Sequence, residues 1–275
     1  MPKWVLTDNR TIANRDCQYD AEVGASVYGG SHRGKEGVSF GSQKFKYTSN
    51  GAMKTKDQVN QYLVEQLKEF GPEELGVMNS SVWREDPRRL VFTLARYKFV
   101  AKMLQGSKKV AEIGCGDGFC ARIVRQEVQS LTITDYDPLF IEQFVRLRNE
   151  EWGINAQVND ILSTPLKEPV DAVYSLDVLE HIPLDKEGIF LENICESLQN
   201  GGVAIFGMPS LESQKYASPE SRVGHVNCKT GKELRVFLEK FFKFVFIFSM
   251  NDEVVHTGYQ PMAHYLMALC CQKHN

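Results

Sequence analysis

The sequence lacks the marks of several protein classes. No apolar run approaches the ~18 residues needed to cross a bilayer, and the first residues hold no apolar stretch typical of a secretory signal. The seven cysteines lie at irregular spacings and form no C-x-x-C pair, which argues against a cysteine zinc site and a disulfide framework. We therefore expect reduced thiols in a cytoplasmic protein that does not enter a membrane.

The chain also lacks an excess of positive charge. Its 32 lysines and arginines stand against 35 aspartates and glutamates, which gives a formal net charge of -3. Such a chain has no overall positive field to attract phosphate backbones. We expect a small-molecule substrate and no nucleic-acid partner, and nothing in the sequence indicates the oligomeric state.

Composition divides the chain into three zones. Residues 1–55 are polar and rich in glycine, and they form either a poorly ordered tail or a lid over the substrate. Residues 56–105 show helical spacing and are expected to form a helical extension over the binding site. Residues 106–275 form the main domain.

Two helices are predicted in the second zone. The first ends at Gly71, which precedes a proline, and the second begins with Asp86 as N-cap and Pro87 at the first helical position. Arg89 and Arg96 lie seven residues apart on one face of the second helix. They are either surface arginines, or one of them reaches a bound ligand.

From residue 109 onward, short apolar runs alternate with helical patterns. This alternation is typical of an α/β fold, in which helices cover both faces of a parallel sheet. The last two β-rich runs have no helical segment between them, so we expect them to pair antiparallel at one edge of the sheet. The predicted strands are 110–113, 131–134, 156–158, 172–175, 203–206, 244–248 and 264–269.

A glycine-rich segment follows the first of these strands and precedes a helix. It reads Glu112-Ile-Gly-Cys-Gly-Asp-Gly118, and its three glycines let the backbone turn tightly and approach a ligand. A dinucleotide fingerprint has the spacing G-x-G-x-x-G, but residue 119 is phenylalanine and the spacing here is G-x-G-x-G. The segment therefore predicts a ligand-binding loop other than the usual dinucleotide site.

Acidic residues end the next two strands. Asp135 lies about twenty residues beyond the glycines, where a carboxylate accepts hydrogen bonds from ribose hydroxyls. Asp137 precedes a proline and is expected to cap the following helix. Asp160 follows the third strand and either accepts a hydrogen bond from an adenine amino group or is an ordinary loop residue.

Taken together, these elements resemble the class I S-adenosylmethionine-dependent methyltransferases. The resemblance covers roughly residues 85–272 and is carried by the glycine segment that Glu112 opens, by Asp135, by Asn159-Asp-Ile161 and by the stretch from Asp171 to Ile182. It implies a doubly wound, mostly parallel sheet of seven strands with a terminal antiparallel hairpin. It also implies S-adenosylmethionine as the cofactor.

The resemblance assigns roles to individual residues of the cofactor site. Asp135 would bind the ribose, and Asp160 and Ile161 would meet the adenine. Arg96, or as second choice Arg89, would face the cofactor carboxylate. The methionine moiety would contact the glycine loop and the end of the fourth strand, at Gly114, Gly116, Gly118, Leu176 and Asp177.

Histidines are the candidate catalytic residues. Methyl transfer from a sulfonium is an in-line displacement, and an acceptor hydroxyl must also lose its proton, a task that suits imidazole. His181 lies at the carboxyl end of the fourth strand, where ligands bind in such sheets. His225 follows the fifth strand and His256 lies between the last two, so all three are expected at one cleft.

The spacing Asp177-Val-Leu-Glu180-His181 raises a second hypothesis. If this stretch is helical, its two acids and its histidine share one face and could bind a divalent metal that lowers the pKa of an acceptor hydroxyl. The resemblance adds that ubiquinone-type and small-RNA methyltransferases use Glu-x-x-Glu-His at these positions for magnesium or a similar ion. Alternatively, Glu180 and His181 only cap and pack the following helix.

Three function classes remain after the sequence is read. The first is a methyltransferase acting on an oxygen or nitrogen of a small molecule. The second is a nicotinamide-dependent oxidoreductase, against which the glycine spacing and the terminal antiparallel pair both argue. The third is a cofactor-binding scaffold without catalysis.

Overall fold

A computed structural model of the chain describes residues 53–274. Residues 1–52 lie outside the described residues, and with them the choice between a tail and a lid. The chain divides between Val64 and Glu65, and the sheet and every candidate site residue belong to the second unit.

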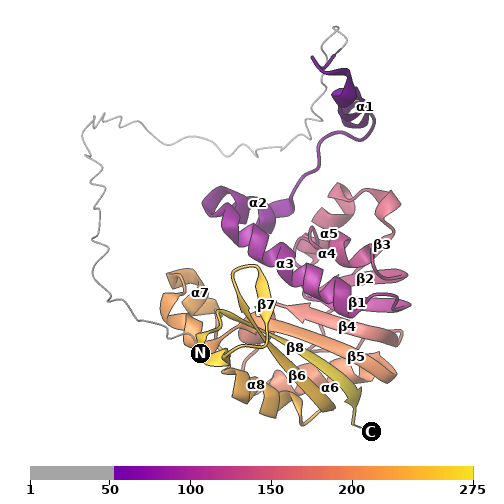
Figure 1. Cartoon of the computed structure of the whole chain (residues 1–275). Coiled ribbons are helices and arrows are strands. Elements are labelled where there is room, and N and C mark those ends of the chain that lie inside the picture. The colour runs from indigo at the N-terminus through magenta and orange to yellow at the C-terminus, as the bar shows by residue number, and fades with distance from the viewer. Residues whose placement is uncertain (1–52, 275) are drawn as a thin grey trace, which may run out of the picture. The chain divides into compact units, whose positions relative to one another are not determined.

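One mixed sheet of eight strands organises the second unit, in the order β3-β2-β1-β4-β5-β8-β6-β7 (Figure 1). The strands from β3 to β5 pair in parallel, whereas β8 pairs antiparallel with both β5 and β6. The bounds are β1 Lys109–Ile113, β2 Ser130–Asp135, β3 Ile154–Val158, β4 Val170–Leu176, β5 Leu198–Pro209, β6 Phe242–Asn251, β7 Val254–His256 and β8 Tyr265–Lys273. The predicted α/β sheet with an antiparallel edge is confirmed.

The prediction of seven strands is one short. The chain reverses direction after β6 at Asp252, whose φ of 51° lies in the left-handed region, and β7 then pairs with the end of β6. A strand of three residues is too short to produce a readable alternation in the sequence, so this segment was expected to be a connecting loop.

The helices include both of those predicted before the sheet. Helix α1 ends at Phe70, just before Gly71, where φ is 76°, and α3 begins after Asp86, whose side chain accepts a hydrogen bond from the Arg88 backbone N–H at 3.2 Å. The helices are α1 Gln61–Phe70, α2 Gly76–Glu85, α3 Pro87–Met103, α4 Ala121–Arg125, α5 Pro138–Leu147, α6 Glu187–Ser197, α7 Pro219–Gly224 and α8 Gly231–Leu238. Short 3-10 helices are η1 Gln58–Asn60, η2 Glu150–Trp152, η3 Leu179–His181, η4 Leu211–Tyr216 and η5 Gln260–Met262.

Helices cover both faces of the sheet (Figure 1). Helices α3, α4 and α5 pack on one face around the buried Tyr174, and α6 and α8 pack on the other around the buried Phe206. The order of the strands reverses between β1 and β4, because β2 and β3 continue on one side of β1 and β5 on the side of β4. Ligands bind beyond the carboxyl ends of the strands at such a reversal.

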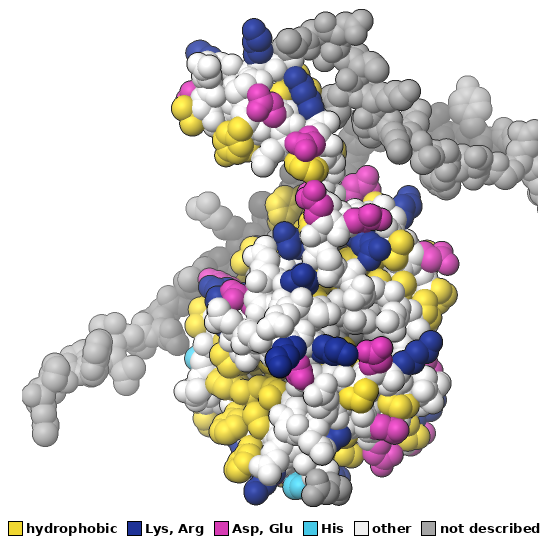
Figure 2. Space-filling view, turned by 90° about the vertical axis from the view of Figure 1, so that its right-hand side faces the viewer, with side chains coloured by type: hydrophobic (Ala, Val, Ile, Leu, Met, Phe, Trp, Pro, Cys, Tyr) yellow, Lys and Arg dark blue, Asp and Glu magenta, His cyan; other side chains and the backbone are white. Residues whose placement is uncertain are grey.

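The surface carries charges of both signs. Figure 2 shows acidic and basic side chains interspersed on one face of the molecule, without a continuous basic surface on that face. Over residues 53–274, no helix combines the length and the apolar character required to span a membrane.

Candidate cofactor and catalytic site

The glycine segment forms a tight loop at the carboxyl end of β1. Its three glycines, Gly114, Gly116 and Gly118, have φ of 75°, 54° and 67°, conformations that side chains with a Cβ rarely adopt. A Cβ at Gly118 would also lie 2.6 Å from a ring carbon of Phe144. The loop therefore needs glycine both for its turn and for its close packing.

Asp135 supports this loop from the end of β2. Its carboxylate is buried and accepts hydrogen bonds from the Gly116 N–H at 2.9 Å and from the Asp137 N–H at 3.0 Å. Each carboxylate oxygen keeps lone pairs for a further donor. Asp137 itself accepts from the Leu139 N–H at 2.9 Å, so the predicted cap of α5 is confirmed.

Helix α2, which the sequence did not predict, packs against the glycine loop. Asp117 accepts hydrogen bonds from the backbone N–H of Asn79 at 2.8 Å and from its side-chain amide at 2.6 Å. A Cβ at Gly116 would lie 2.6 Å from the sulfur of Met78. The helix was missed because it has no clear apolar stripe; contacts with residues distant in sequence hold it.

Glu112, the acid that opens the loop motif, is buried beneath it. Its carboxylate accepts hydrogen bonds from the hydroxyls of Tyr97 at 2.5 Å and Tyr174 at 2.8 Å. Burial raises the pKa of Glu112 to about 7, although the two tyrosine hydrogen bonds act in the opposite direction. Glu112 therefore connects α3 and β4 beneath the loop through these two hydrogen bonds.

The buried Glu112 should make stability depend on pH. Because its pKa rises on folding from 4.5 to about 7, the folded state holds this proton more tightly, and the stability from Glu112 is lost as the pH rises through that interval. Glu112→Gln removes the titration. As the pH rises from 4.5 to 8, the free energy of unfolding of the variant should therefore increase by about 3 kcal/mol relative to that of the wild type. Urea unfolding at several pH values measures this gain, and a constant difference would contradict it.

The structure distinguishes between the two candidate arginines. Arg89 is exposed, and its Nη1 lies 3.7 Å from a carboxylate oxygen of Glu85, four residues earlier in the chain. Arg96 is largely buried, and its Nη1 donates to both carboxylate oxygens of Asp177 at 2.9 and 2.7 Å. Its guanidinium stacks on Tyr265, with 3.8 Å between the central carbon and the ring centroid. Arg96, and not Arg89, therefore reaches the end of β4.

The stretch from Asp177 to His181 is not the helix that the metal hypothesis assumed. Asp177 has φ of 57°, which a right-handed helix does not permit, and the 3-10 helix η3 begins only at Leu179. The expectation that Asp177, Glu180 and His181 share one helical face is therefore wrong. Asp177 pairs with Arg96 instead.

The residues assigned to the adenine lie beyond β3. Asp160 accepts hydrogen bonds from the Leu162 N–H at 3.0 Å and from the Ser163 hydroxyl at 2.6 Å, so its carboxylate shapes its own turn. Ile161 is buried in the core on the side of α6. Leu176 ends β4 and is also buried.

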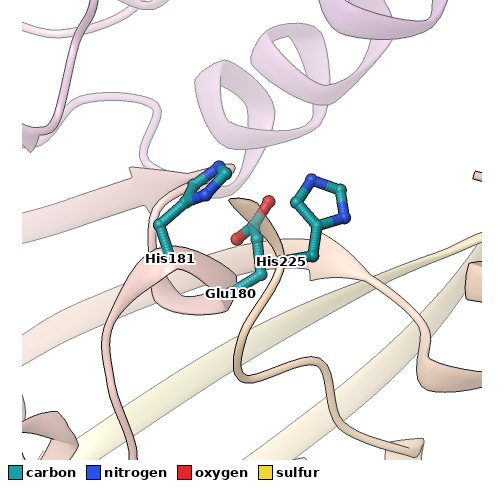
Figure 3. A group of neighbouring side chains, drawn as sticks. All are labelled: Glu180, His181 and His225. Carbon is teal, nitrogen blue, oxygen red and sulfur yellow. The ribbon is translucent and has the colours of Figure 1, made fainter. Parts of the chain in front are cut away.

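Glu180, His181 and His225 come together beyond the carboxyl end of β4. Figure 3 shows the Glu180 carboxylate between the two imidazoles, and one possible ligand atom of each residue lies within 4.8 Å of those of the others. The imidazole centroids are 5.1 Å apart. Two of the predicted histidines therefore lie close together. In this group of candidate ligands, His225 replaces Asp177, which the sequence had favoured.

Hydrogen bonds orient both imidazoles. Nδ1 of His181 lies 2.9 Å from the carbonyl oxygen of Gly224, and Nδ1 of His225 lies 2.9 Å from the amide oxygen of Gln214. Both oxygens can only accept, so each Nδ1 donates and each neutral ring keeps its lone pair on Nε2. Burial, and then the neighbouring His181, lower the pKa of His225 and favour its neutral form.

The Glu180 carboxylate is the most unusual group of this cluster. It is 1% exposed, and neither of its oxygens has a hydrogen-bond partner among the residues that the structure describes. Burial, and then the charge of Asp177, raise its pKa well above 4.5. A buried carboxylate without a partner carries a free-energy cost, which a bound proton or a bound cation would relieve.

A buried ion pair anchors the segment that carries His225. The ammonium of Lys229 lies 2.7 Å from Glu187 of α6 and donates to the Asn227 side chain at 2.8 Å. The Asn227 backbone N–H in turn donates to the carbonyl oxygen of Glu180 at 3.0 Å. Neither these anchors nor the orienting carbonyls stood out in the sequence, because lysine, asparagine and glycine in a loop carry no pattern.

His256 does not join the cluster. It lies in β7, where its Nε2 pairs with the Asn251 side chain at 2.9 Å and its Nδ1 accepts from the Gly258 N–H at 2.9 Å. Both ring nitrogens are therefore engaged within the hairpin. His256 is therefore not one of the three side chains that come together, and the strand β7 holds its ring.

Comparisons with known proteins extend this picture. Residues 110–202 match the family model of a methyltransferase domain. Among curated proteins, no sequence matches the chain.

Solved structures share the fold. The N-methyltransferase NodS from Bradyrhizobium japonicum WM9, in complex with S-adenosyl-L-homocysteine, is 18% identical and covers 76% of this chain and 97% of its own, with a TM-score of 0.55. A putative methyltransferase complexed with the Haloferax volcanii Trm112 methyltransferase activator is 13% identical and covers 73% and 100%, with a TM-score of 0.56. DhpI with S-adenosylhomocysteine is 17% identical and covers 70% and 91%, with a TM-score of 0.51.

The family match falls on the part of the chain that contains the glycine loop, Asp135 and the end of β4. The sheet as a whole, including the antiparallel strands β6 to β8 beyond residue 202, has a fold shared with structures that contain S-adenosylhomocysteine. The chain therefore contains a methyltransferase domain over residues 110–202, within a fold that it shares with solved methyltransferase structures.

Proposed function

We propose that this protein transfers the methyl group of S-adenosylmethionine to an oxygen or nitrogen of a small-molecule acceptor. The observation that carries the proposal is the cluster of Glu180, His181 and His225 beyond β4, close to Asp177. It combines a buried acid with two imidazoles whose Nε2 atoms are free to accept a proton. An oxygen or nitrogen nucleophile must lose a proton as it receives a methyl group, and these are the groups that could remove it.

The cofactor-binding residues are proposed from their positions around the glycine loop. Gly114, Gly116 and Gly118 have the conformation of a loop that admits close approach of a ligand. Asp135 has lone pairs left for the ribose hydroxyls. We place Asp177 and Leu176 near the methionine moiety, Arg96 near its carboxylate, and Asp160 and Ile161 near the adenine.

The chain's own contribution to such a reaction is alignment and proton removal. Holding the nucleophile, the methyl carbon and the sulfur in line supplies on the order of 7–11 kcal/mol of the barrier. A positioned base adds typically a 10²–10⁴-fold acceleration. His181 and His225 are proposed for that role, and Glu180 is proposed to stabilise the imidazolium that forms.

A divalent cation fits the same three side chains. The orphaned carboxylate of Glu180 and the two Nε2 lone pairs supply one oxygen and two nitrogen ligands, and the Nδ1 hydrogen bonds are the outer contacts that orient metal-binding imidazoles. Such a donor set suits a transition metal better than Mg²⁺, which prefers oxygen. A bound cation would lower the pKa of an acceptor hydroxyl.

The surface charge supports a small acceptor. The face in Figure 2 has no continuous basic surface, and the net charge of -3 supplies no general attraction for phosphate backbones. A nicotinamide-dependent oxidoreductase is disfavoured by the glycine spacing and the family match, and a scaffold without catalysis would bind the cofactor but transfer nothing.

Calorimetry and a turnover assay test the proposal together. The protein should bind S-adenosylmethionine, and a panel of hydroxyl- and amine-bearing small molecules should give formation of S-adenosylhomocysteine. Binding without turnover on the whole panel would favour the scaffold, and absence of binding would overturn the proposal. Treatment with EDTA followed by added Zn²⁺, Mn²⁺ or Mg²⁺ separates the two forms of the mechanism: unchanged activity throughout would remove the metal.

A further inference from the structure

Tyr265, at the start of β8, has a buried hydroxyl that no described residue satisfies. The side chain is 3% exposed, and within residues 53–274 its oxygen has no hydrogen-bond partner of normal geometry. A buried hydroxyl without a partner is costly, so its retention calls for an explanation. The sequence did not single this residue out, because a tyrosine at the start of an apolar strand is ordinarily a core residue.

The neighbours of Tyr265 place its hydroxyl at the end of β4. A Cβ at Gly207 of β5 would lie 2.6 Å from the Tyr265 oxygen and 2.7 Å from a methyl carbon of Leu176. Gly207 is also the strand partner of Leu176, and its carbonyl accepts from the Asp177 N–H at 2.9 Å. The absence of a side chain at Gly207 therefore gives the hydroxyl the space to reach this position.

A second buried donor without a partner lies on the ring of Tyr265, in the side chain of Arg96. The Arg96 guanidinium stacks on it, and Nε of Arg96 is also buried without a partner among the described residues. Arg96 donates to Asp177 through Nη1 alone in the hydrogen bonds found. The stacked pair thus has two buried donors, the N–H of Arg96 Nε and the O–H of Tyr265, beside the positive charge of the guanidinium. Such a group of donors is suited to bind a carboxylate.

Tyr265 remains a donor at all physiological pH values. Burial, and then the negative charge of Asp177, hold its pKa well above 10, with a smaller contribution from a weak contact between the hydroxyl and the Asp177 carboxylate, although Arg96 acts in the opposite direction. A protonated phenol next to a guanidinium suits an anionic group and does not suit an ammonium group.

We propose that the Tyr265 hydroxyl donates a hydrogen bond to the α-carboxylate of the bound methyl donor, beside Arg96. The proposal deepens the proposed function and rests on it. Tyr265 then has two roles in one side chain: its ring orients the guanidinium, and its hydroxyl binds the same carboxylate.

Two ligands that differ in the amino-acid part test the proposal. S-adenosylhomocysteine carries the carboxylate, and 5′-methylthioadenosine is the same thioether nucleoside without it. In calorimetric titrations, Tyr265→Phe should weaken the binding of S-adenosylhomocysteine about 10-fold or more, because a hydrogen bond to a charged group is lost. The binding of methylthioadenosine should not change, and the melting temperature without ligand should stay the same or rise, because a buried orphan hydroxyl is removed.

Two further variants complete the experiment. Tyr265→Leu removes the ring as well and should weaken S-adenosylhomocysteine further, whereas Tyr174→Phe, a buried tyrosine that bonds Glu112, should leave the ratio of the two affinities unchanged. If Tyr265→Phe changes both affinities equally or neither, or lowers the melting temperature with the ratio intact, the hydroxyl serves only the fold and the proposal is overturned. Failure of the wild-type protein to bind S-adenosylhomocysteine would instead overturn the proposed function itself.

Discussion

Replacing Asp135 with alanine is expected to weaken the binding of S-adenosylhomocysteine about 100-fold, because the hydrogen bonds that we propose from the ribose to this charged acceptor would be lost. The same carboxylate holds the Gly116 N–H at 2.9 Å, so the variant also loosens the loop that the ligand contacts. Calorimetric titration of both proteins measures the change in Kd.

Asp137→Ala provides the matched control for this variant. Asp137 lies two residues away and caps α5 through the Leu139 N–H, so its loss should cost about 1 kcal/mol of stability and leave the affinity intact. If the two variants bind the ligand equally well, the assignment of Asp135 to the ribose is wrong. If both lose affinity equally, general damage to the loop explains the result.

Replacing His225 or His181 with alanine is expected to lower kcat by about 100-fold or more, with the affinity for S-adenosylhomocysteine unchanged. Both imidazoles lie beside the Glu180 carboxylate, and their Nδ1 atoms are engaged by Gly224 and Gln214. The loss should therefore appear in turnover and not in cofactor binding. Steady-state kinetics with an acceptor found by screening, together with calorimetry, separate the two effects.

His256→Ala serves as the control for the histidine variants. Its ring is engaged within the β6–β7 hairpin by Asn251 and Gly258, so its replacement should leave kcat close to that of the wild type. A loss at His256 as large as that at His225 would contradict the assignment of the cluster. A large loss of cofactor affinity in His181→Ala would likewise show that this residue belongs to the donor side of the site.

The structure and the sequence favour different sets of candidate metal ligands. Spacing along the chain favoured Asp177 with Glu180 and His181, because residues three and four apart share a helical face. That reasoning fails when one residue of the set has a left-handed backbone, as Asp177 does, and sequence does not reveal such a φ for an aspartate. His225, more than forty residues further on, takes the place, since the ion pair of Lys229 and Glu187 fastens its segment to α6.

The features that depend on local chemistry and periodicity could be predicted from the amino-acid sequence. The alternating runs predicted the α/β sheet and its antiparallel edge, the glycine spacing predicted the ligand loop, and Asp86 and Asp137 predicted the starts of α3 and α5. These features depend on residues close together in the chain, so a pattern can reveal them.

Only the tertiary structure decided which side chains meet across the site. The choice of Arg96 over Arg89, the pairing of Arg96 with Asp177, the exclusion of His256 and the unsatisfied hydroxyl of Tyr265 all depend on elements far apart in sequence. Such contacts are set by how helices and strands pack and by which buried polar groups find partners, and neither leaves a periodic trace in the chain. The glycine loop could therefore be predicted from residues 112–118, whereas the groups that we propose around the reacting centre became visible only in the fold.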